Sequence, residues 1–378
     1  MFLQKLSLIN FKNCREAEFV FSEKINCFIG DNGVGKTNLL DAIYYLSFCK
    51  SYFNSIDSQN ILHSENFFSI HGTYVKNGDS TALISCILEQ NKRKRFKLNK
   101  KEYNRLSDHI GLFPLVMISP YDRDLINEGS DIRRKFIDGV ISQYDKTYLD
   151  NLIKYNKSLD QRNTLLKRFA ENNFFDSEAI EIWDAQLIKY GNMIFNQRTD
   201  FLKDFIPIFE DYFEFLTSHL KNNSSRPETV NIEYDSQLKD NDFRSLLENN
   251  LQKDRMLKYS TVGTHKDDLI FTIGGYPIKK FGSQGQQKSF VIAIKLAQFE
   301  YTKKIKGFKP VLLFDDIFDK LDNLRVEQLI KLVSNNSFGQ VFITDTQRER
   351  IEKVFHTVKI DHKIFQVLNG KSTEISDI

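Results

Sequence analysis

Along the chain, apolar and polar positions alternate in ways that divide its 378 residues into three stretches. In the first stretch, short apolar runs between polar turns predict strands at residues 3–11, 25–29, 68–75, 81–88 and 114–118. One helix interrupts them, because apolar residues recur at helical spacing at Leu39, Leu40, Ala42, Ile43 and Leu46. Residues 1–120 are therefore predicted to form mainly strands and turns around one helix.

From about residue 130 to residue 255 the apolar spacing becomes helical. Two seams with three-and-four spacing predict two antiparallel helices joined near Asn172 and Asn173, and Arg162 interrupts the first seam. At roughly 25 residues per helix, the predicted arm is about 40 Å long. It is far too short for the long coiled coils of chromosome-structuring ATPases. A polar segment at 222–227 predicts a surface loop.

The final third returns to an α/β pattern, with strands predicted at residues 269–273, 311–314 and 340–343 and helices between them. An α/β fold is thus predicted to be split by a helical insertion. The predicted segments are 1–125 for the first part of the α/β head, 126–255 for the helical lobe with its arm, and 256–378 for the rest of the head.

Composition limits the possible partners and compartments. The net charge is only +3, so a nucleic-acid surface has to come from local clustering of basic residues. The four cysteines form no CxxC pair, which favours reduced thiols and a cytoplasmic location. The N-terminus lacks the pattern of a signal peptide, and no run of about 18 apolar residues predicts a membrane span.

Residues 30–37 fit the phosphate-binding loop (P-loop) pattern and lie between a predicted strand and a predicted helix. The loop consists of Gly30, Asp31, Asn32, Gly33, Val34, Gly35, Lys36 and Thr37. Its glycines let successive backbone N–H groups face a phosphate. Lys36 is expected to reach the β- and γ-phosphates of ATP, and the Thr37 hydroxyl to bind Mg²⁺. The alternative is a chance match in a glycine-rich turn, which the flanking strand and helix disfavour.

Two acids follow the apolar run at 311–314. Asp315 is expected to hold Mg²⁺ through water, and Asp316 to orient or deprotonate the attacking water as the catalytic residue. Phosphoryl transfer depends on such positioning and charge neutralisation. The alternative is that the acids only form an N-cap for a following helix.

Upstream of these acids lies a candidate signature, Ser283, Gln284, Gly285 and Gln286. Ser283 can offer a hydroxyl and Gly285 a backbone N–H to a γ-phosphate at the N-terminus of an apolar helix. The alternative is a plain polar N-cap, which does not account for the adjacent glutamines. P-loop, signature and acid pair in this order describe an ABC-type ATPase, in which the signature of one subunit closes the ATP site of another.

These segments resemble the RecF family, bacterial recombination and repair ATPases related to the SMC group. The similarity covers nearly the whole chain and is most specific at residues 263–269 (GTHKDDL) and 282–288 (GSQGQQK). Asp319 and Asp322 occupy the D-loop position, although serine is common where Asp319 stands. Phe53 replaces an expected basic residue, and Thr344-Asp345-Thr346 replaces the switch histidine of transporter ATPases.

The resemblance implies an ABC-type P-loop ATPase head with an inserted helical arm, and ATP and Mg²⁺ as cofactors. It further implies that ATP drives homodimerisation and binding to gapped or single-stranded–double-stranded DNA, with slow hydrolysis driving release. The implied partners are RecR and RecO.

DNA contacts are also suggested by a basic run, Lys92, Arg93, Lys94 and Arg95. Its functional interpretation is a phosphate-contacting edge, and the alternative is a solvated hairpin surface. Residues 133–135 are a second basic candidate, and the alternative is that they only pair with Asp131 and Asp138. His265, Asp267 and Asp268 could suggest a metal site, but two further ligands are missing, so a structural or interdomain contact is preferred.

Two rival classes remain. A transporter-type ABC ATPase is disfavoured by the long stretch between Lys36 and Ser283 and by the missing switch histidine. A nuclease-linked SMC-like head is disfavoured by the short arm and the absence of an added acidic nuclease domain.

Overall fold

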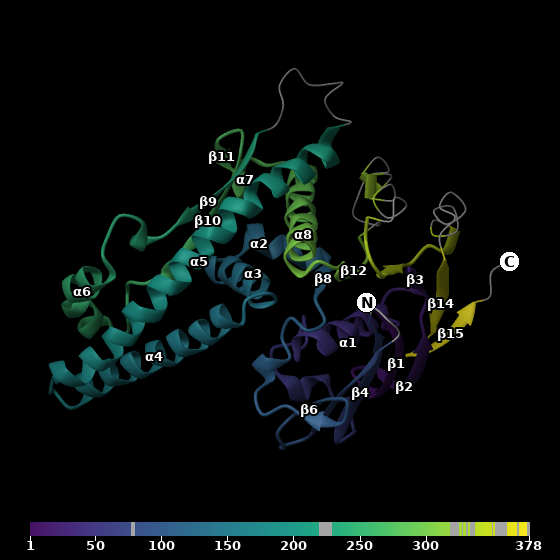
Figure 1. Cartoon of the computed structure of the whole chain (residues 1–378), viewed down its shortest axis with the longest axis horizontal. Helices are drawn as coiled ribbons and strands as arrows, with labels where there is room; N and C mark the ends of the chain where they lie inside the picture. Colours follow the sequence, from purple (N-terminus) through teal and green to yellow (C-terminus); the bar gives the residue numbers. More distant parts are fainter. Residues whose placement is uncertain are drawn as a thin grey trace. The chain divides into compact units, whose positions relative to one another are not determined.

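The computed structural model describes residues 1–76, 80–218, 229–317, 325, 326, 328, 329, 332, 337–349, 351, 361–368 and 370–375. The chain forms two compact units (Figure 1). Unit 1 comprises Met1–Asp122, Glu214–Asn223 and Lys288–Ile378, and unit 2 comprises Arg123–Phe213 and Ser224–Gln287. Unit 1 thus joins an N-terminal and a C-terminal segment.

The nucleotide-type sheet of unit 1 has six strands in the order β15-β14-β3-β13-β12-β8. Its strands are β3 (Ile25–Ile29), β8 (Leu115–Ile118), β12 (Val311–Phe314), β13 (Val341–Asp345), β14 (His362–Leu368) and β15 (Lys371–Ile375). All neighbours pair in parallel except β15, which is antiparallel to β14. The predicted split α/β head is confirmed, because β3 and β8 pair with strands from the end of the chain.

A second, antiparallel sheet in unit 1 has the order β2-β1-β4-β5-β6-β7. Its strands are β1 (Phe2–Phe11), β2 (Cys14–Val20), β4 (Phe67–Val75), β5 (Thr81–Glu89), β6 (Arg95–Leu98) and β7 (Lys101–Glu102). One hydrophobic core joins both sheets of unit 1 to α1 (Lys36–Phe48). Consequently α1 is buried on most of its surface, as expected for a helix that is apolar nearly all round.

Aromatic packing accounts for part of the high phenylalanine content. Rings from both sheets meet edge to face: Phe21 lies 4.8 Å from Phe342 and Phe19 lies 5.4 Å from Phe365, measured between ring centroids. Such T-shaped pairs add to the gain from area burial. These aromatic side chains therefore form core structure.

Helices dominate unit 2. They are α2 (Asp124–Asn127), α3 (Ser130–Ser142), α4 (Lys146–Glu171), α5 (Ser177–Thr217, assigned to unit 2 up to Phe213), α6 (Phe243–Leu257) and α7 (Ile278–Phe281). The predicted helical pair is confirmed as α4 and α5, but α5 has 41 residues, much longer than expected. Arg162, the interruption in the first seam, is fully buried and bonds Asp184 at 2.5 Å and Asp254 at 2.6 Å.

Unit 2 also holds a three-stranded sheet, in the order β11-β10-β9, that the sequence pattern did not indicate. It contains β9 (Val230–Asp235), β10 (Asp268–Ile273) and β11 (Tyr276–Pro277). The predicted strand at 269–273 therefore belongs to this small sheet, and unit 2 extends to Gln287. The three-segment division 1–125, 126–255 and 256–378 stays a prediction, and the loop expected at 222–227 lies outside the described residues.

The last helix described in full, α8 (Gln284–Lys306), begins in unit 2 and continues into unit 1 at Lys288. Its last turn carries three lysines, which suits the negative end of a helix dipole. Across the described ranges, no helix has both the length and the apolar character needed to cross a bilayer. All four cysteines are free and buried.

Candidate nucleotide-binding site

The predicted P-loop connects the carboxyl end of β3 to the N-terminus of α1, as its function requires. Gly35 has a φ of 111°, and a Cβ there would lie 2.5 Å from Asn13 Nδ2. Gly30 has a φ of 154°, and a Cβ would lie 2.5 Å from the carbonyl oxygen of Val367. Only glycine therefore suits both ends of this loop.

Lys36 closes the loop from within. Its Nζ donates to the carbonyl oxygens of Gly30 at 2.8 Å and Asp31 at 3.0 Å, and the side chain is buried. No side chain caps α1 and no acid lies in its first turn. The positive end of this helix, together with the Lys36 ammonium, is thus arranged to meet an anion.

Neighbouring turns hold the P-loop in place. Asn13, in the turn between β1 and β2, donates from Nδ2 to the carbonyl of Val34 at 3.0 Å and accepts from Asn38 Nδ2 at 2.7 Å. The Gly370 N–H, in the turn between β14 and β15, donates to the same Val34 carbonyl at 3.2 Å. The sequence pattern did not predict this contact of Asn13.

The structure brings Thr37 and Asp315 together, although they are far apart in sequence. The Thr37 hydroxyl donates to Asp315 Oδ1 at 2.8 Å. The same oxygen accepts a second bond, at 3.0 Å, from the hydroxyl of Thr344 on β13. Burial raises the pKa of Asp315 to about 6; the Asp316 carboxylate adds to this rise, whereas the Thr37 hydroxyl opposes it.

Asp316 differs from Asp315 in both backbone and partners. Its φ of 44° lies in the left-handed region, which asparagine and aspartate tolerate best among non-glycine residues. Its N–H donates to the Thr344 hydroxyl at 2.8 Å. Its Oδ1 is buried without a hydrogen-bond partner among the residues that the structure describes. A buried carboxylate oxygen with no protein partner is suited to a bound ligand or water.

These residues fit a magnesium nucleotide. The Thr37 hydroxyl and the Asp315 carboxylate are the hard oxygen donors that Mg²⁺ prefers. Within the described part of the chain, neither Asp315 nor Asp316 forms an ion pair. The Lys36 ammonium opposes the rise in the pKa of Asp315 as a nearby charge, but it bonds loop carbonyls and not the acids. Asp319 and Asp322, the predicted D-loop residues, lie outside the described residues.

The candidate signature lies in unit 2, at the N-terminus of α8. Ser283 and Gln286 form a reciprocal capping box: the Ser283 N–H donates to Gln286 Oε1 at 2.6 Å, and the Gln286 N–H donates to Ser283 Oγ at 3.2 Å. Gln287 Nε2 donates to the carbonyls of Ile278 and Gly282. The N-cap interpretation therefore does explain both glutamines, contrary to the sequence argument, and the role toward a γ-phosphate stays a prediction for Ser283, Gln284, Gly285 and Gln286.

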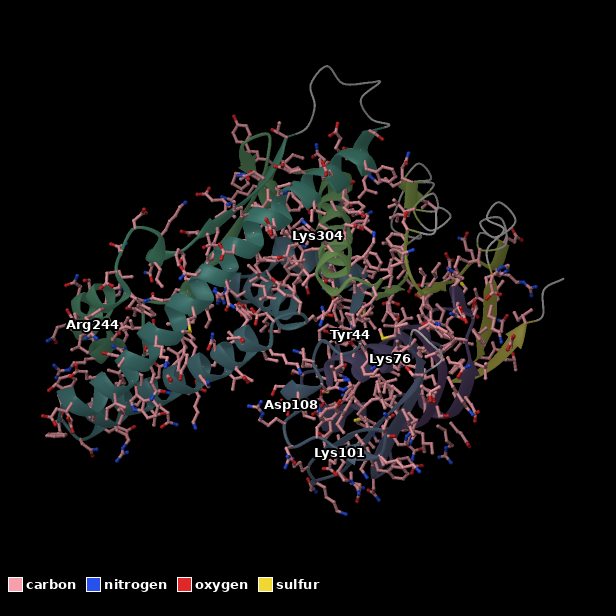
Figure 2. The ribbon with its side chains drawn as sticks, in the orientation of Figure 1. Tyr44, Lys76, Lys101, Asp108, Arg244 and Lys304 are labelled. Atoms are coloured by element: carbon pink, nitrogen blue, oxygen red, sulfur yellow. The ribbon has the colours of Figure 1, made fainter. Side chains whose placement is uncertain are left out.

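The basic run lies at the hairpin between β5 and β6, near Lys101, which Figure 2 labels on β7. Lys92 and Arg95 both pair with Glu89, and Arg93 donates to the carbonyl of Asn104. Lys94 is different: its side chain is only 10% exposed, and its Nζ pairs with Asp57 at 2.6 Å. Lys94 therefore serves the interior of unit 1, and only the other three basic residues of the run remain candidates for DNA contact.

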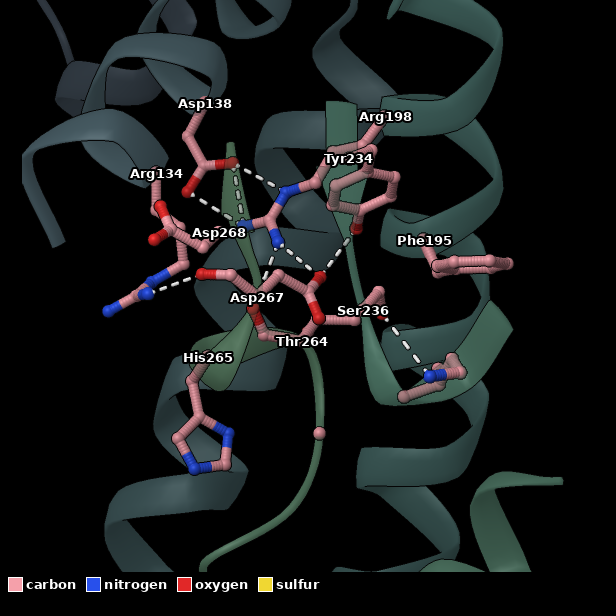
Figure 3. Close-up of polar contacts among 12 residues, drawn as sticks. Arg134, Asp138, Phe195, Arg198, Tyr234, Ser236, Thr264, His265, Asp267 and Asp268 are labelled. Atoms are coloured by element: carbon pink, nitrogen blue, oxygen red, sulfur yellow. Dashed lines mark hydrogen bonds and ion pairs between the residues drawn. The ribbon is translucent and has the colours of Figure 1, made fainter. Parts of the chain in front are cut away.

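The segment at 263–269 lies within a polar network of unit 2 (Figure 3). Arg198 on α5 bonds Asp138 on α3 and Asp267, both at 2.9 Å. Arg133 pairs with Asp268, and both ring nitrogens of His265 are bonded, by Tyr155 and by the carbonyl of Ser260. These residues bind other parts of unit 2, and residues 133–134 likewise face inward.

A split α/β head, with a phosphate-binding loop and an acid pair at the carboxyl ends of parallel strands, defines the ABC-type ATPase head. In agreement, residues 2–369 match the family model of the RecF/RecN/SMC N terminal domain. The Smc head domain of Pyrococcus furiosus shares the fold with a TM-score of 0.57 and 18% identity, covering 100% of this chain and 96% of that chain.

Closer similarity identifies the family. A DNA replication and repair protein RecF of Phocaeicola vulgatus is 50% identical over 375 residues, covering 99% of this chain and 98% of its own length. The RecF protein of Flavobacterium johnsoniae is 53% identical over 369 residues, covering 98% of this chain and 100% of its own length. A solved RecF-ATP structure of the RecFOR pathway matches with a TM-score of 0.88 and 28% identity, covering 99% of this chain and 98% of that chain. The chain belongs to the RecF family of DNA replication and repair proteins.

Proposed function

We propose that this chain is a cytoplasmic, ATP-dependent DNA-binding protein and a weak Mg²⁺-dependent ATPase. ATP binding drives homodimerisation and binding to gapped or single-stranded–double-stranded DNA, and slow hydrolysis releases the DNA. RecR and RecO are its proposed partners. The observation that carries the proposal is the hydrogen bond between Thr37 and Asp315, next to the P-loop that Lys36 bridges. Beside it, Asp316 Oδ1 has no partner among the described residues.

Each of these residues has a proposed role in phosphoryl transfer. Lys36 binds the β- and γ-phosphates, and the loop N–H groups cradle them. Thr37 and Asp315 would hold Mg²⁺, which supplies neutralisation of phosphate charge when it is bound. Asp316 orients or deprotonates the attacking water, and its unpartnered Oδ1 leaves an acceptor for that water.

The proposal gives the signature a role in trans. Ser283 is exposed at the N-terminus of α8, where the partial positive charge of the helix favours an anion. The capping box fixes the Ser283 hydroxyl and leaves it at the surface. We assign this surface to the γ-phosphate in the ATP site of a second copy, with Gly285 contributing a backbone N–H.

Sedimentation with ATP and a gapped duplex tests the proposal. The wild-type chain should dimerise with ATP and bind the duplex, whereas Ser283→Arg should bind ATP but stay monomeric and hydrolyse poorly. Ser177→Arg is the matched control, because Ser177 is also an exposed serine at a helix start in unit 2. If Ser283→Arg dimerises as the wild type does, the trans role is wrong; if the wild type ignores ATP, the proposed function is wrong.

A further inference from the structure

Thr344 lies at the carboxyl end of β13, the strand that separates the P-loop strand β3 from the acid-bearing strand β12. It is fully buried. Its hydroxyl donates to Asp315 Oδ1 at 3.0 Å and accepts from the N–H of Asp316 at 2.8 Å. One side chain thus bonds both acids of the site.

This arrangement differs from an ordinary satisfied threonine in a strand. A buried hydroxyl needs only one partner, and a nearby backbone carbonyl usually supplies it. Here the donated bond goes to a carboxylate and the accepted bond comes from a residue with a φ of 44°. A left-handed backbone at a non-glycine residue carries strain and persists only where its surroundings hold it.

The two hydroxyls on Asp315 Oδ1 also restrict the rotation of that carboxylate. Thr37 approaches from α1 and Thr344 from β13, so the oxygen is held from two elements. The Thr37 hydroxyl can donate its proton to Asp315 while a lone pair of its oxygen remains for a cation. Partners of a ligating carboxylate commonly set its orientation and the metal affinity.

We infer that Thr344 is a positioning residue for ATP hydrolysis: its hydroxyl fixes the Asp315 carboxylate toward Thr37 and holds the Asp316 backbone, so that Asp316 Oδ1 stays without a partner among the described residues. The inference rests on the proposed ATPase function. It gives the position between β3 and β12 an action on the acids themselves.

Three variants separate positioning from plain stability. Thr344→Val keeps the β-branched shape in a strand but removes the hydroxyl, and Thr344→Ser keeps the hydroxyl. Thr302→Val is the matched control, because Thr302 on α8 is also fully buried in unit 1 and its hydroxyl has no partner among the described residues. Each variant is assayed for nucleotide affinity with and without Mg²⁺, for ATP turnover and for thermal unfolding.

For Thr344→Val, kcat should fall about tenfold, and the gain in nucleotide affinity from Mg²⁺ should shrink about tenfold, so the KM for ATP in the presence of Mg²⁺ should rise by a similar factor. Affinity without Mg²⁺ should stay at the wild-type value. Thr344→Ser should restore both properties, and Thr302→Val should alter neither.

The inference is overturned if Thr344→Val turns over ATP as the wild type does, or if serine fails to rescue. It is also overturned if the loss of affinity is equal with and without Mg²⁺. A wild-type chain that neither binds nor hydrolyses ATP would instead remove the proposed function, and the inference with it.

Discussion

Two clusters of buried and half-buried acids, one in each unit, differ in what neutralises their negative charge. In unit 2, the Arg198 guanidinium lies between the carboxylates of Asp138 and Asp267 and bonds both. In unit 1, Asp315 Oδ1 accepts only from the neutral hydroxyls of threonines, and Asp316 Oδ1 has no partner among the described residues. Burial raises the pKa of Asp267 and of Asp315, but only Asp267 has an arginine to oppose the rise.

The difference separates structural acids from acids kept for a ligand. Removing a carboxylate from water is costly unless a cation or several hydrogen bonds replace the water. The unit 2 cluster carries its cation within the fold, so it links α3, α5 and the residues before β10 without outside help. The unit 1 pair forms no ion pair with a described residue, which suits a site whose metal cation arrives with a nucleotide.

The largest expected effect comes from removing the internal cation. Arg198→Met should leave the buried Asp267 and the half-buried Asp138 without a counter-charge and lower the free energy of unfolding by about 3–5 kcal/mol. Thermal and urea unfolding measure the change. Arg244→Met is the control, since Arg244, labelled in Figure 2, is an exposed residue 4.0 Å from Glu248 on the same helix. Equal unfolding midpoints for the two variants would contradict the structural role of Arg198.

A change in the unit 1 pair should act in the opposite sense. Asp316→Asn keeps a residue that tolerates the left-handed backbone and removes the charge of a half-buried carboxylate whose Oδ1 has no partner among the described residues, so stability should not fall. Hydrolysis should fall about 100-fold, because the water loses its orienting carboxylate. ATP affinity and dimerisation should persist, and an ATP-bound dimer should accumulate in sedimentation. A clear loss of stability would place Asp316 with the structural acids.

Lys36 sharpens the comparison, because its ammonium lies in unit 1 but bonds loop carbonyls and not the acids. Lys36→Ala should weaken ATP binding by roughly 1.5–3 kcal/mol, about tenfold or more, because the charge-assisted bond to phosphate is removed. ATP-dependent DNA binding should vanish with it. Lys304→Ala, an exposed position on α8 labelled in Figure 2, provides the control. An unchanged ATP titration curve would remove Lys36 from the site.

The smallest effects concern the hairpin between β5 and β6, where exposed basic residues lie next to Lys94, whose charge is paired within unit 1. Replacing Lys92, Arg93 and Arg95 by alanine should reduce the slope of log affinity against log salt by roughly 0.7–0.9 for each DNA phosphate that is no longer neutralised. Lys94→Ala should leave the slope unchanged and lower the unfolding midpoint, because the substitution removes the ion pair between Lys94 and Asp57. Identical slopes for the triple variant and the wild type would return the run to a solvated surface.

Local pattern was enough to predict much of the head. The strand at 25–29, the loop at 30–37 and the helix after it are contiguous, so apolar spacing and glycine placement identify them directly. The apolar run at 311–314 is likewise recognisable from local pattern, because two acids end it, and β12 is confirmed as a buried strand. In each of these cases, the residues that determine the local structure are neighbours in sequence.

Contacts between distant segments were not predictable in this way. The Thr344 hydroxyl reaches Asp315 only because β13 lies beside β12. The pattern of apolar and polar residues does not reveal which strands pair. Lys94 looks like its basic neighbours until Asp57 and the carbonyl of Cys49 are placed around it. Arg198 lies in an ordinary helical stretch, and its partners come from α3 and from residue 267.

The bonds across the chain also bear on how it folds during synthesis. The Leu3 N–H donates to Gln340 Oε1, 337 positions later, and Gln340 Nε2 returns bonds to the carbonyls of Leu3 and Ser22. The fully buried strand β3 likewise pairs on both sides with strands made much later, β13 and β14. A nascent chain thus exposes the apolar strand before its P-loop until β13 and β14 have been made, which leaves that strand open to wrong pairing during synthesis.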